Sequence, residues 1–129
     1  MRITLSFNGI AVDVQVNKGT TFLRGYSGTG KTLLLSAIEL YCRNQGISCY
    51  LCDYHSQDLS EDKIYASCSG VQVLLLDNAD LYLTPILLKR LKDVEYIIIS
   101  KKILFGFDLV SATSCLVHYD NMQLTLEEF

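Results

Sequence analysis

A glycine-rich stretch, 25-GYSGTGKT-32, constrains the fold of this chain more than any other feature. It follows the apolar run 20-TTFLR-24 and precedes 33-LLLSAIELYC-42, so it separates a predicted buried strand from a predicted helix. Its glycines permit backbone conformations that other residues avoid, and they keep side chains away from anything the backbone approaches. The arrangement predicts a strand–loop–helix unit with an anion site at the loop.

The stretch matches the pattern G-x-x-x-x-G-K-[ST] without a mismatch. In that pattern, N–H groups of the loop and of the first helical turn converge on phosphate oxygens. Lys31 would reach the β- and γ-phosphates, and the Thr32 hydroxyl would bind Mg²⁺. The predicted phosphate-binding residues are Gly25, Ser27, Gly28, Thr29, Gly30, Lys31 and Thr32.

A second buried strand ends in an acidic residue. The run 73-VLLLD-77 places Asp77 at the carboxyl end of a continuous apolar segment. In an open parallel sheet, ligands bind at the edge formed by the carboxyl ends of the strands. We therefore predict that Asp77 and Thr32 hold the same Mg²⁺ ion.

Strand-length and helical segments alternate through the middle of the chain. A helix over 31–46 is expected to end at its basic last turn and at Gly46. The segments after it are predicted as a strand over 47–53, a short helix near Ser60 to Cys68, a strand over 71–78, a helix from Thr84-Pro85 through Lys92 and a strand over 95–100. Apolar strands that alternate with helices indicate a parallel sheet covered on both faces.

The two ends of the chain are predicted to add antiparallel strands to the sheet. The segment 2-RITLSFNGIAVDVQV-16 alternates around Asn8-Gly9, a dipeptide that favours a tight hairpin turn. Near the other end, 115-CLVHYD-120 and 122-MQLTLEE-128 are predicted as two short strands around Asp120-Asn121.

Residues 20–100 resemble a P-loop NTPase, with 25-GYSGTGKT-32 as the Walker A motif and 73-VLLLD-77 as the Walker B motif. Because the strand 47–53 separates the two motifs, the chain looks like the group that includes ABC, RecA-like and AAA-type ATPases. The resemblance implies an α/β, three-layer fold with a mainly parallel central sheet and antiparallel additions at the N- and C-terminal ends. It also implies one nucleotide-binding domain over 1–129, with the strand 95–100 between the two motif strands and Ser100 at a polar sensor position near the γ-phosphate.

No single family of that group fits throughout. The two terminal strand pairs resemble an ABC ATPase core, but the sequence has no LSGGQ-type signature. The segment 47-ISCYLCDYHSQD-58 looks like the RecA-like strand that ends in a catalytic acid. An AAA-type protein would need a C-terminal helical lid, which the sequence does not show.

The general base for hydrolysis is the weak point of the resemblance. In ABC and AAA-type relatives a Glu follows the Walker B Asp, whereas this chain has Asn78, which can orient water but cannot accept its proton. Asp80 is one substitute, and Asp53 at the end of the inserted strand is the RecA-like alternative, with His55 and Asp58 nearby. An arginine finger is also unassigned: of Arg24, Arg43 and Arg90, the last is the best candidate to act across a subunit contact, although a solvated helix face is the simpler interpretation.

Bulk composition sets further limits. The chain has 129 residues, half of them hydrophobic, and a formal net charge of −3, so no general affinity for nucleic acid is expected. Cys49 and Cys52 form a C-x-x-C spacing, but residues three apart in a strand face opposite ways, so we expect reduced thiols without a metal or disulfide there. No leader or membrane-spanning run is recognised, and we expect a cytoplasmic protein without membrane insertion.

The sequence thus predicts an ATP-binding, Mg²⁺-dependent protein with weak ATPase activity. Its conformation would respond to the γ-phosphate, and its work would pass to an unidentified protein partner or to a homo-oligomer. A nucleotide-dependent interaction module that does not hydrolyse ATP is the alternative that Asn78 keeps open. A small-molecule or nucleotide kinase is less favoured, because 101–118 contains no arginine for a lid, and guanine preference is not expected without an N-K-x-D motif.

Overall fold

The computed structural model describes residues 1–25, 30–53, 60–100 and 113–128. In chain order its elements are β1 (Arg2–Phe7), β2 (Ile10–Gln15), β3 (Gly19–Arg24), α1 (Lys31–Gln45), β4 (Cys49–Cys52), α2 (Glu61–Cys68), β5 (Val73–Leu76), the 3₁₀ helix η1 (Ala79–Leu81), α3 (Pro85–Arg90), β6 (Tyr96–Ser100), β7 (Thr113–Asp120) and β8 (Gln123–Glu128). The helices and strands expected for these residues therefore form. The main difference is length, because β4 and β5 have only four residues each.

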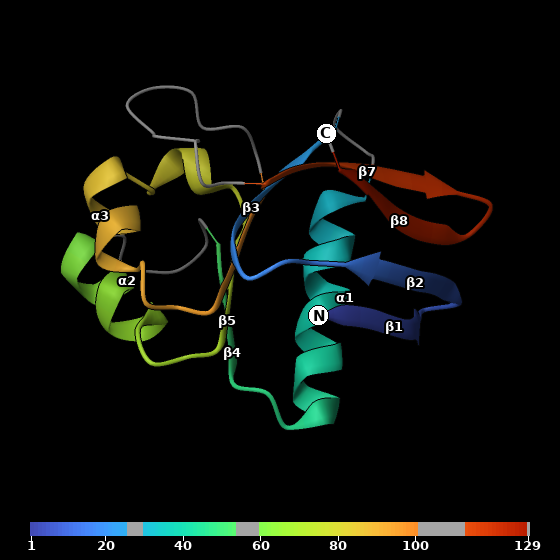
Figure 1. Ribbon diagram of the computed structural model, residues 1–129, viewed down its shortest axis with the longest axis horizontal. Helices are drawn as coiled ribbons and strands as arrows, with labels where there is room; N and C mark the ends of the chain where they lie inside the picture. The colour runs from blue at the N-terminus through green and yellow to red at the C-terminus, as the bar shows by residue number, and fades with distance from the viewer. Residues whose placement is uncertain (26–29, 54–59, 101–112, 129) are drawn as a thin grey trace.

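The described strands form one sheet in the order β1-β2-β8-β7-β3-β6-β5-β4 (Figure 1). From β7 to β4 all neighbouring strands pair in parallel. Strand β6 lies between β3 and β5, so the strand before the glycine loop and the strand before Asp77 are separated by one strand, as the resemblance implied.

The sheet as a whole is mixed, which corrects the expectation of a mainly parallel one. Strands β1 and β2 pair antiparallel, as do β7 and β8, and both hairpins belong to the same sheet as the parallel strands. The physical reason is the short turn in each hairpin, because two residues can join antiparallel neighbours but not parallel ones. A short parallel pairing of β2 with β8 links the hairpins to each other.

Helices cover both faces of the parallel strands. Helix α1 lies on one side of β3, β4 and β5, and α2 and α3 lie on the other (Figure 1). Two apolar clusters match this arrangement, one against α1 and one against α2 and α3. Every residue of β5 and β6 is buried, which explains why neither strand alternates polar with apolar residues and why Ser100, at the end of β6, is the one small polar residue of the two.

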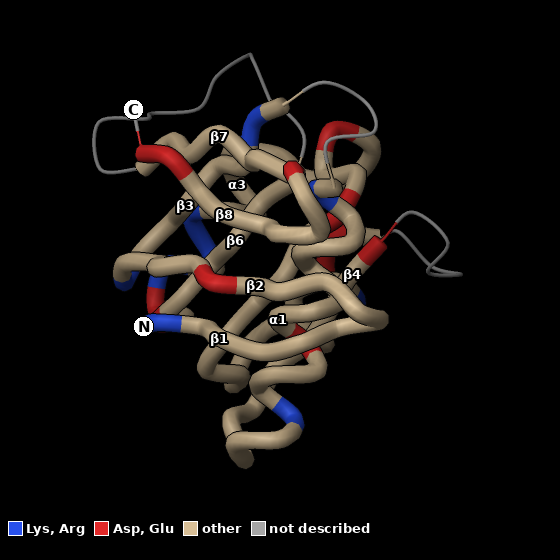
Figure 2. The backbone as a smooth tube through the Cα atoms, turned by 90° about the vertical axis from the view of Figure 1, so that its right-hand side faces the viewer, with Lys and Arg blue, Asp and Glu red and all other residues tan. Residues whose placement is uncertain are grey.

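The sheet curls around α1. Strands β1 and β4 are the two edges of the sheet, yet α1 packs against both of them. On the β1 side, the Tyr41 hydroxyl donates a hydrogen bond to the backbone carbonyl of Arg2 at 3.2 Å. Figure 2 shows the strands β1, β2, β8 and β7 running across α1. The amino end of α1 is therefore close to the hairpins as well as to the parallel strands.

The two hairpin turns differ in how well the sequence locates them. Asn8 and Gly9 have positive φ angles of 51° and 78°, and they close the β1–β2 hairpin as predicted. The second turn is one residue later than expected, at Asn121 and Met122, because Asp120 pairs with Gln123. Met122 has a φ of 60°, an uncommon conformation for an unbranched apolar side chain.

Cys49 and Cys52 lie on opposite faces of β4, as their spacing predicts. Cys49 packs against the cluster below α1, and Cys52 belongs to the cluster below α2 and α3. All five cysteines are free thiols. The hydrogen bond that Cys49 makes to Cys42 raises the pKa of Cys49, the bond that Cys68 makes to Cys52 raises the pKa of Cys68, and burial adds to both shifts.

Candidate functional site

The carboxyl edge of the parallel strands gathers the predicted site residues. Gly25 follows β3, Asp53 follows β4, Asp77 follows β5, and Ser100 is the last residue of β6. The strand registers bring these four ends close to one level. Ser100 is almost fully buried, with 1% of its surface exposed. Ligands of open parallel sheets bind at this edge, so the topology assembles residues that are far apart in the chain.

Lys31 and Gly30 form the amino end of α1. The Lys31 ammonium donates to the backbone carbonyl of Gly25, with 2.5 Å between Nζ and O. Gly30 caps the helix with a φ of 91°, which costs glycine little. Within the described part of the chain, no side chain caps this end and its first turn holds no acidic residue. An anion at this end would meet the positive end of the helix dipole.

Thr32 and Asp77 meet at the foot of α1. The Thr32 hydroxyl donates a hydrogen bond to Oδ2 of Asp77 at 3.1 Å. Thr32 belongs to the first turn of α1, whereas Asp77 follows β5. Because β6 pairs with both β3 and β5, it sets the distance between α1, which follows β3, and the end of β5. The contact between Thr32 and Asp77 therefore depends on the pairing of these three strands. The two side chains predicted to share a metal ion are thus adjacent.

Backbone contacts hold Asp77 in place. Its side chain is mostly buried, with 7% exposed. Its N–H donates to the carbonyl of Cys52 at 2.8 Å, and its Oδ1 accepts from the N–H of Asn78 at 3.0 Å. One carboxylate oxygen is therefore oriented by Asn78 while the other faces Thr32.

Tyr82 is a positioning residue that the sequence did not reveal. Its buried hydroxyl donates to the carbonyl of Asp77 at 2.7 Å and to that of Cys52 at 3.0 Å, so it links the ends of β4 and β5. Burial raises the pKa of Tyr82 well above its ordinary value, with further contributions from Cys52 and Asp77. A single aromatic residue between two elements carries no periodic or motif signal, which is why sequence reasoning missed it.

The oxygen donors of Thr32 and Asp77 fit Mg²⁺. This ion usually takes one or two protein ligands and fills its other positions with water and phosphate oxygens. Among the residues that the structure describes, no group of three or more His, Cys, Asp or Glu could hold a metal. A hydroxyl and a carboxylate at the amino end of α1 are consistent with an ion that arrives with a ligand carrying its own oxygen donors.

The three candidates for water activation have different surroundings. Asn78 is half-buried with a φ of 51° and a ψ of 40°, a left-handed conformation that Asn tolerates better than Glu. Its backbone therefore supplies a structural reason for Asn at the position where the sequence resemblance led us to expect Glu. Asp80 lies in η1 and is exposed, whereas Asp53 is half-buried beside the end of β5.

Several predicted residues lie outside the described part of the chain. These are Ser27, Gly28 and Thr29 of the glycine loop, and His55 and Asp58 after β4. Their assignments stay predictions.

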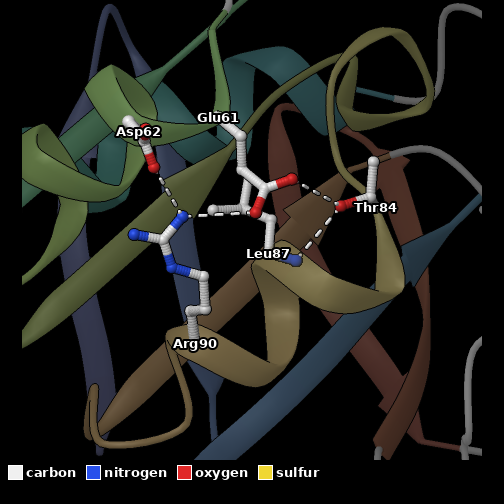
Figure 3. A network of polar contacts seen from close by, with 5 residues as sticks. All are labelled: Glu61, Asp62, Thr84, Leu87 and Arg90. Carbon is white, nitrogen blue, oxygen red and sulfur yellow. Dashed lines mark hydrogen bonds and ion pairs between the residues drawn. The ribbon is translucent and has the colours of Figure 1, made fainter.

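Arg90 connects α2 with α3 (Figure 3). Its guanidinium bonds to Glu61 at 3.2 Å and to Asp62 at 3.0 Å, and it lies 4.2 Å from the centre of the Tyr65 ring. These contacts raise the pKa of Arg90, with the Asp62 hydrogen bond the largest cause. The side chain is therefore neither a plain solvated residue nor free to act in trans, because it bridges two helices of its own chain.

The other two arginine candidates, Arg43 and Arg24, belong to α1 and to β3. Arg43 pairs with Glu39 one turn earlier on α1, at 3.6 Å. Arg24 is the half-buried last residue of β3. Neither position gives a reason to assign Arg43 or Arg24 as an arginine finger.

Comparison with solved structures relates the fold to a known type. The chain is similar to a structure titled as the crystal structure of a DNA replication initiation factor, with 20% identity and a TM-score of 0.52 over 67% of this chain. The fold is P-loop NTPase-like. The match covers 32% of that longer chain, and at this identity it supports the fold alone. No protein-family model matches the sequence, and no curated protein matches it.

The described helices contain no segment that is both long and apolar enough to cross a membrane. Lys and Arg residues are distributed over several elements of the described backbone (Figure 2). The expected lack of general nucleic-acid affinity stays a prediction.

Proposed function

We propose that this chain binds ATP with Mg²⁺ and hydrolyses it slowly, as one P-loop nucleotide-binding domain that acts through a protein partner or through self-association. The observation that carries the proposal is the 3.1 Å contact between Thr32 and Asp77. It joins the first turn of α1, whose positive dipole end would attract an anion, with the end of the strand expected to complete a magnesium site. The P-loop NTPase-like fold supports the same interpretation.

Each residue at the carboxyl edge has a defined task in this proposal. The Lys31 ammonium would exchange the carbonyl of Gly25 for the β- and γ-phosphate oxygens of ATP. The Thr32 hydroxyl and the Asp77 carboxylate would hold Mg²⁺, which neutralises phosphate charge when bound. Ser100, buried between the ends of β3 and β5, would sense the γ-phosphate.

Slow hydrolysis follows from the residues near Asp77. Asn78 can orient a water molecule but cannot take its proton. The proton would have to pass to a carboxylate, and Asp53 and Asp80 are the candidates. Asp53 has the better position, because it is half-buried and lies next to Asp77 across the β4–β5 pair.

A nucleotide-dependent interaction module without hydrolysis is the second candidate. The observation that favours it is the left-handed backbone of Asn78, which disfavours the Glu that would act as a base. Both candidates require the same Mg·ATP site, so only turnover distinguishes them.

Equilibrium binding and turnover test the proposal together. ATP and GTP are titrated with Mg²⁺ and with EDTA, and radiolabelled ATP is followed for phosphate release in the same preparation. We expect ATP binding that depends on Mg²⁺ and slow release of phosphate. Binding without release would favour the interaction module, and transfer to an added acceptor would favour a kinase. Failure to bind Mg·ATP would overturn the proposal.

A further inference from the structure

Strand β7 continues past the end of its neighbour β3 at the carboxyl edge. Arg24, the last residue of β3, pairs with Leu116, and β7 runs on to Asp120. At about 3.3 Å per residue, the four additional residues carry the β7–β8 hairpin about 13 Å further. The hairpin therefore extends beyond the sheet on the side where the candidate phosphate site lies.

Alternate residues of β7 show where α1 stops covering this hairpin. Cys115, Val117 and Tyr119 are on one face, because residues two apart in a strand point the same way. The first two are buried in the cluster below α1, whereas Tyr119 is 41% exposed. Tyr119 is therefore positioned just beyond the amino end of the helix.

Gly30 shows how closely the hairpin approaches that helix end. A Cβ atom at Gly30 would lie 2.9 Å from Cδ2 of Leu124 and 3.6 Å from Cβ of Tyr119. Tyr119 and Leu124 are directly opposite each other in the β7–β8 pair. The side chain of Tyr119 thus lies beside Gly30, at the amino end of α1.

Met122 completes a small apolar surface with Tyr119. The Tyr119 hydroxyl contacts Sδ of Met122 at 3.3 Å. Met122 is 51% exposed and is held in its unusual conformation by the hairpin turn. An exposed aromatic ring and a thioether side by side form a surface on which a flat, polarisable group can stack.

The sheet order determines which part of a nucleotide would reach this surface. Thr32 and Asp77 place the metal, and with it the β- and γ-phosphates, toward β5. Strand β7 is on the other side of β3 from β6 and β5. A triphosphate whose terminal end points toward β5 therefore directs its nucleoside away from β5, toward the β7–β8 hairpin.

We propose that Tyr119, supported by Met122, binds the nucleobase of ATP by stacking. This inference rests on the proposed function, because it assigns the base-binding part of the same site. Stacking on an aromatic ring favours any base over no base, so the hairpin contributes affinity for nucleotides rather than strict selection of adenine.

Substitution of Tyr119 tests the inference with a ligand that lacks a base. Tyr119→Ala is expected to weaken ATP binding about tenfold and to leave inorganic tripolyphosphate binding unchanged. Tyr119→Phe keeps the ring and should retain ATP affinity within about twofold. Circular dichroism of each variant shows whether the fold is kept, and the tripolyphosphate affinity shows whether the phosphate site is intact.

A fluorescent reporter gives a second readout. The chain contains no Trp, so Tyr119→Trp creates a single tryptophan signal at the proposed platform. ATP should quench this signal, and tripolyphosphate should not. Tyr41→Trp is the matched control, because Tyr41 lies on α1 about 15 Å along the helix from Lys31.

The outcomes separate this inference from the function on which it rests. It is overturned if the wild-type chain binds ATP no more tightly than tripolyphosphate, or if Tyr119→Ala binds ATP as the wild type does. Equal losses for ATP and tripolyphosphate would also overturn it, because they mean that Tyr119 acts on phosphate binding and not on the base. In these three cases the wild-type chain still binds the polyphosphate, so the proposed phosphate site stands. A wild-type chain that binds neither ligand overturns both proposals.

Discussion

The hydroxyl of Thr32 lies 3.1 Å from the carboxylate of Asp77 and bonds to the oxygen that the Asn78 N–H leaves open. One carboxylate oxygen is thus committed to the backbone, and the other is available with Thr32. This division makes the charge of Asp77 separable from its backbone contact, because the single oxygen of an amide can still accept from the Asn78 N–H while its NH₂ group faces the Thr32 hydroxyl.

Asp77→Asn should therefore keep the fold and lose magnesium-dependent affinity. The change preserves the side-chain volume, and the amide oxygen can still accept from the Asn78 N–H. The amide NH₂ group would donate to the Thr32 hydroxyl, which now accepts, and the negative charge that holds the cation is lost. We expect the gain in ATP affinity on adding Mg²⁺ to fall by about 10–100-fold. Titration of ATP with Mg²⁺ and with EDTA measures this gain. Asp93→Asn, an exposed site between α3 and β6, is the control and should bind as the wild type does.

Lys31→Ala should abolish most ATP binding without unfolding the chain. Alanine is a good helix former, so the start of α1 is retained. The variant loses a charged donor to the phosphates, and ATP affinity should fall about 100-fold. Calorimetric titration beside a thermal melt checks both parts. Lys92→Ala removes an equal charge after α3, and an equal loss of affinity there would show that Lys31 has no special role.

Some of this site could be predicted because it is local in the sequence. The glycine spacing around Lys31 specifies a loop and a helix start within a few residues, and the apolar run before Asp77 specifies a buried strand. The position of β6 between the two motif strands came from the resemblance, because strand order depends on contacts between distant segments. The pairing of β2 with β8 is equally non-local, and no pattern in either strand announced it.

Other features were missed because they depend on side-chain geometry. Tyr82 orders Asp77 through a hydroxyl that reaches two carbonyls, and only the folded strand ends bring those carbonyls together. Arg90 was a candidate for a role across subunits until the structure placed Glu61 and Asp62 beside it. No sequence pattern distinguished Tyr119 from the other seven tyrosines. Its place beside the amino end of α1 follows from the length of β7, which only the structure shows.

Asp53→Asn and Asp80→Asn should differ in turnover. A positioned general base typically contributes about 100-fold or more to a rate. We expect Asp53→Asn to lose this contribution with ATP affinity retained, because Asp53 is half-buried beside the end of β5. Asp80→Asn, at an exposed site, should hydrolyse ATP at the wild-type rate. Single-turnover assays at saturating ATP measure both, and the reverse ranking would assign the base to Asp80.

Tyr82→Phe should destabilise the chain by about 1–2 kcal/mol at neutral pH, because the carbonyl of Asp77 loses a buried donor. Burial raises the pKa of Tyr82 above its ordinary value of 10.0, so the wild type keeps this stabilisation below pH 10 and loses it as the pH rises further, where only the unfolded chain ionises. The stability difference between variant and wild type should therefore be constant up to about pH 9 and narrow above pH 10.

Urea unfolding of both proteins between neutral and alkaline pH measures that difference. Tyr41→Phe is the control, because its hydroxyl bonds to a carbonyl in an exposed setting. If the difference in unfolding free energy between Tyr82→Phe and the wild type stays constant above pH 10, burial does not raise the pKa of Tyr82 as assigned here.

Gly30→Ala combines two separate penalties, and a second glycine distinguishes them. Gly30 and Gly46 flank α1 with φ angles of 91° and 71°, and an L-residue in this region costs about 1–2 kcal/mol. A Cβ at Gly46 meets nothing within 4 Å, whereas one at Gly30 lies 2.9 Å from the fully buried Leu124. Gly30→Ala should therefore destabilise the chain by about 1–3 kcal/mol more than Gly46→Ala, since the core must shift. If the two variants unfold at the same urea concentration, the β7–β8 hairpin can move away from the added Cβ atom without cost. Tyr119 would then have no fixed position beside the phosphate site.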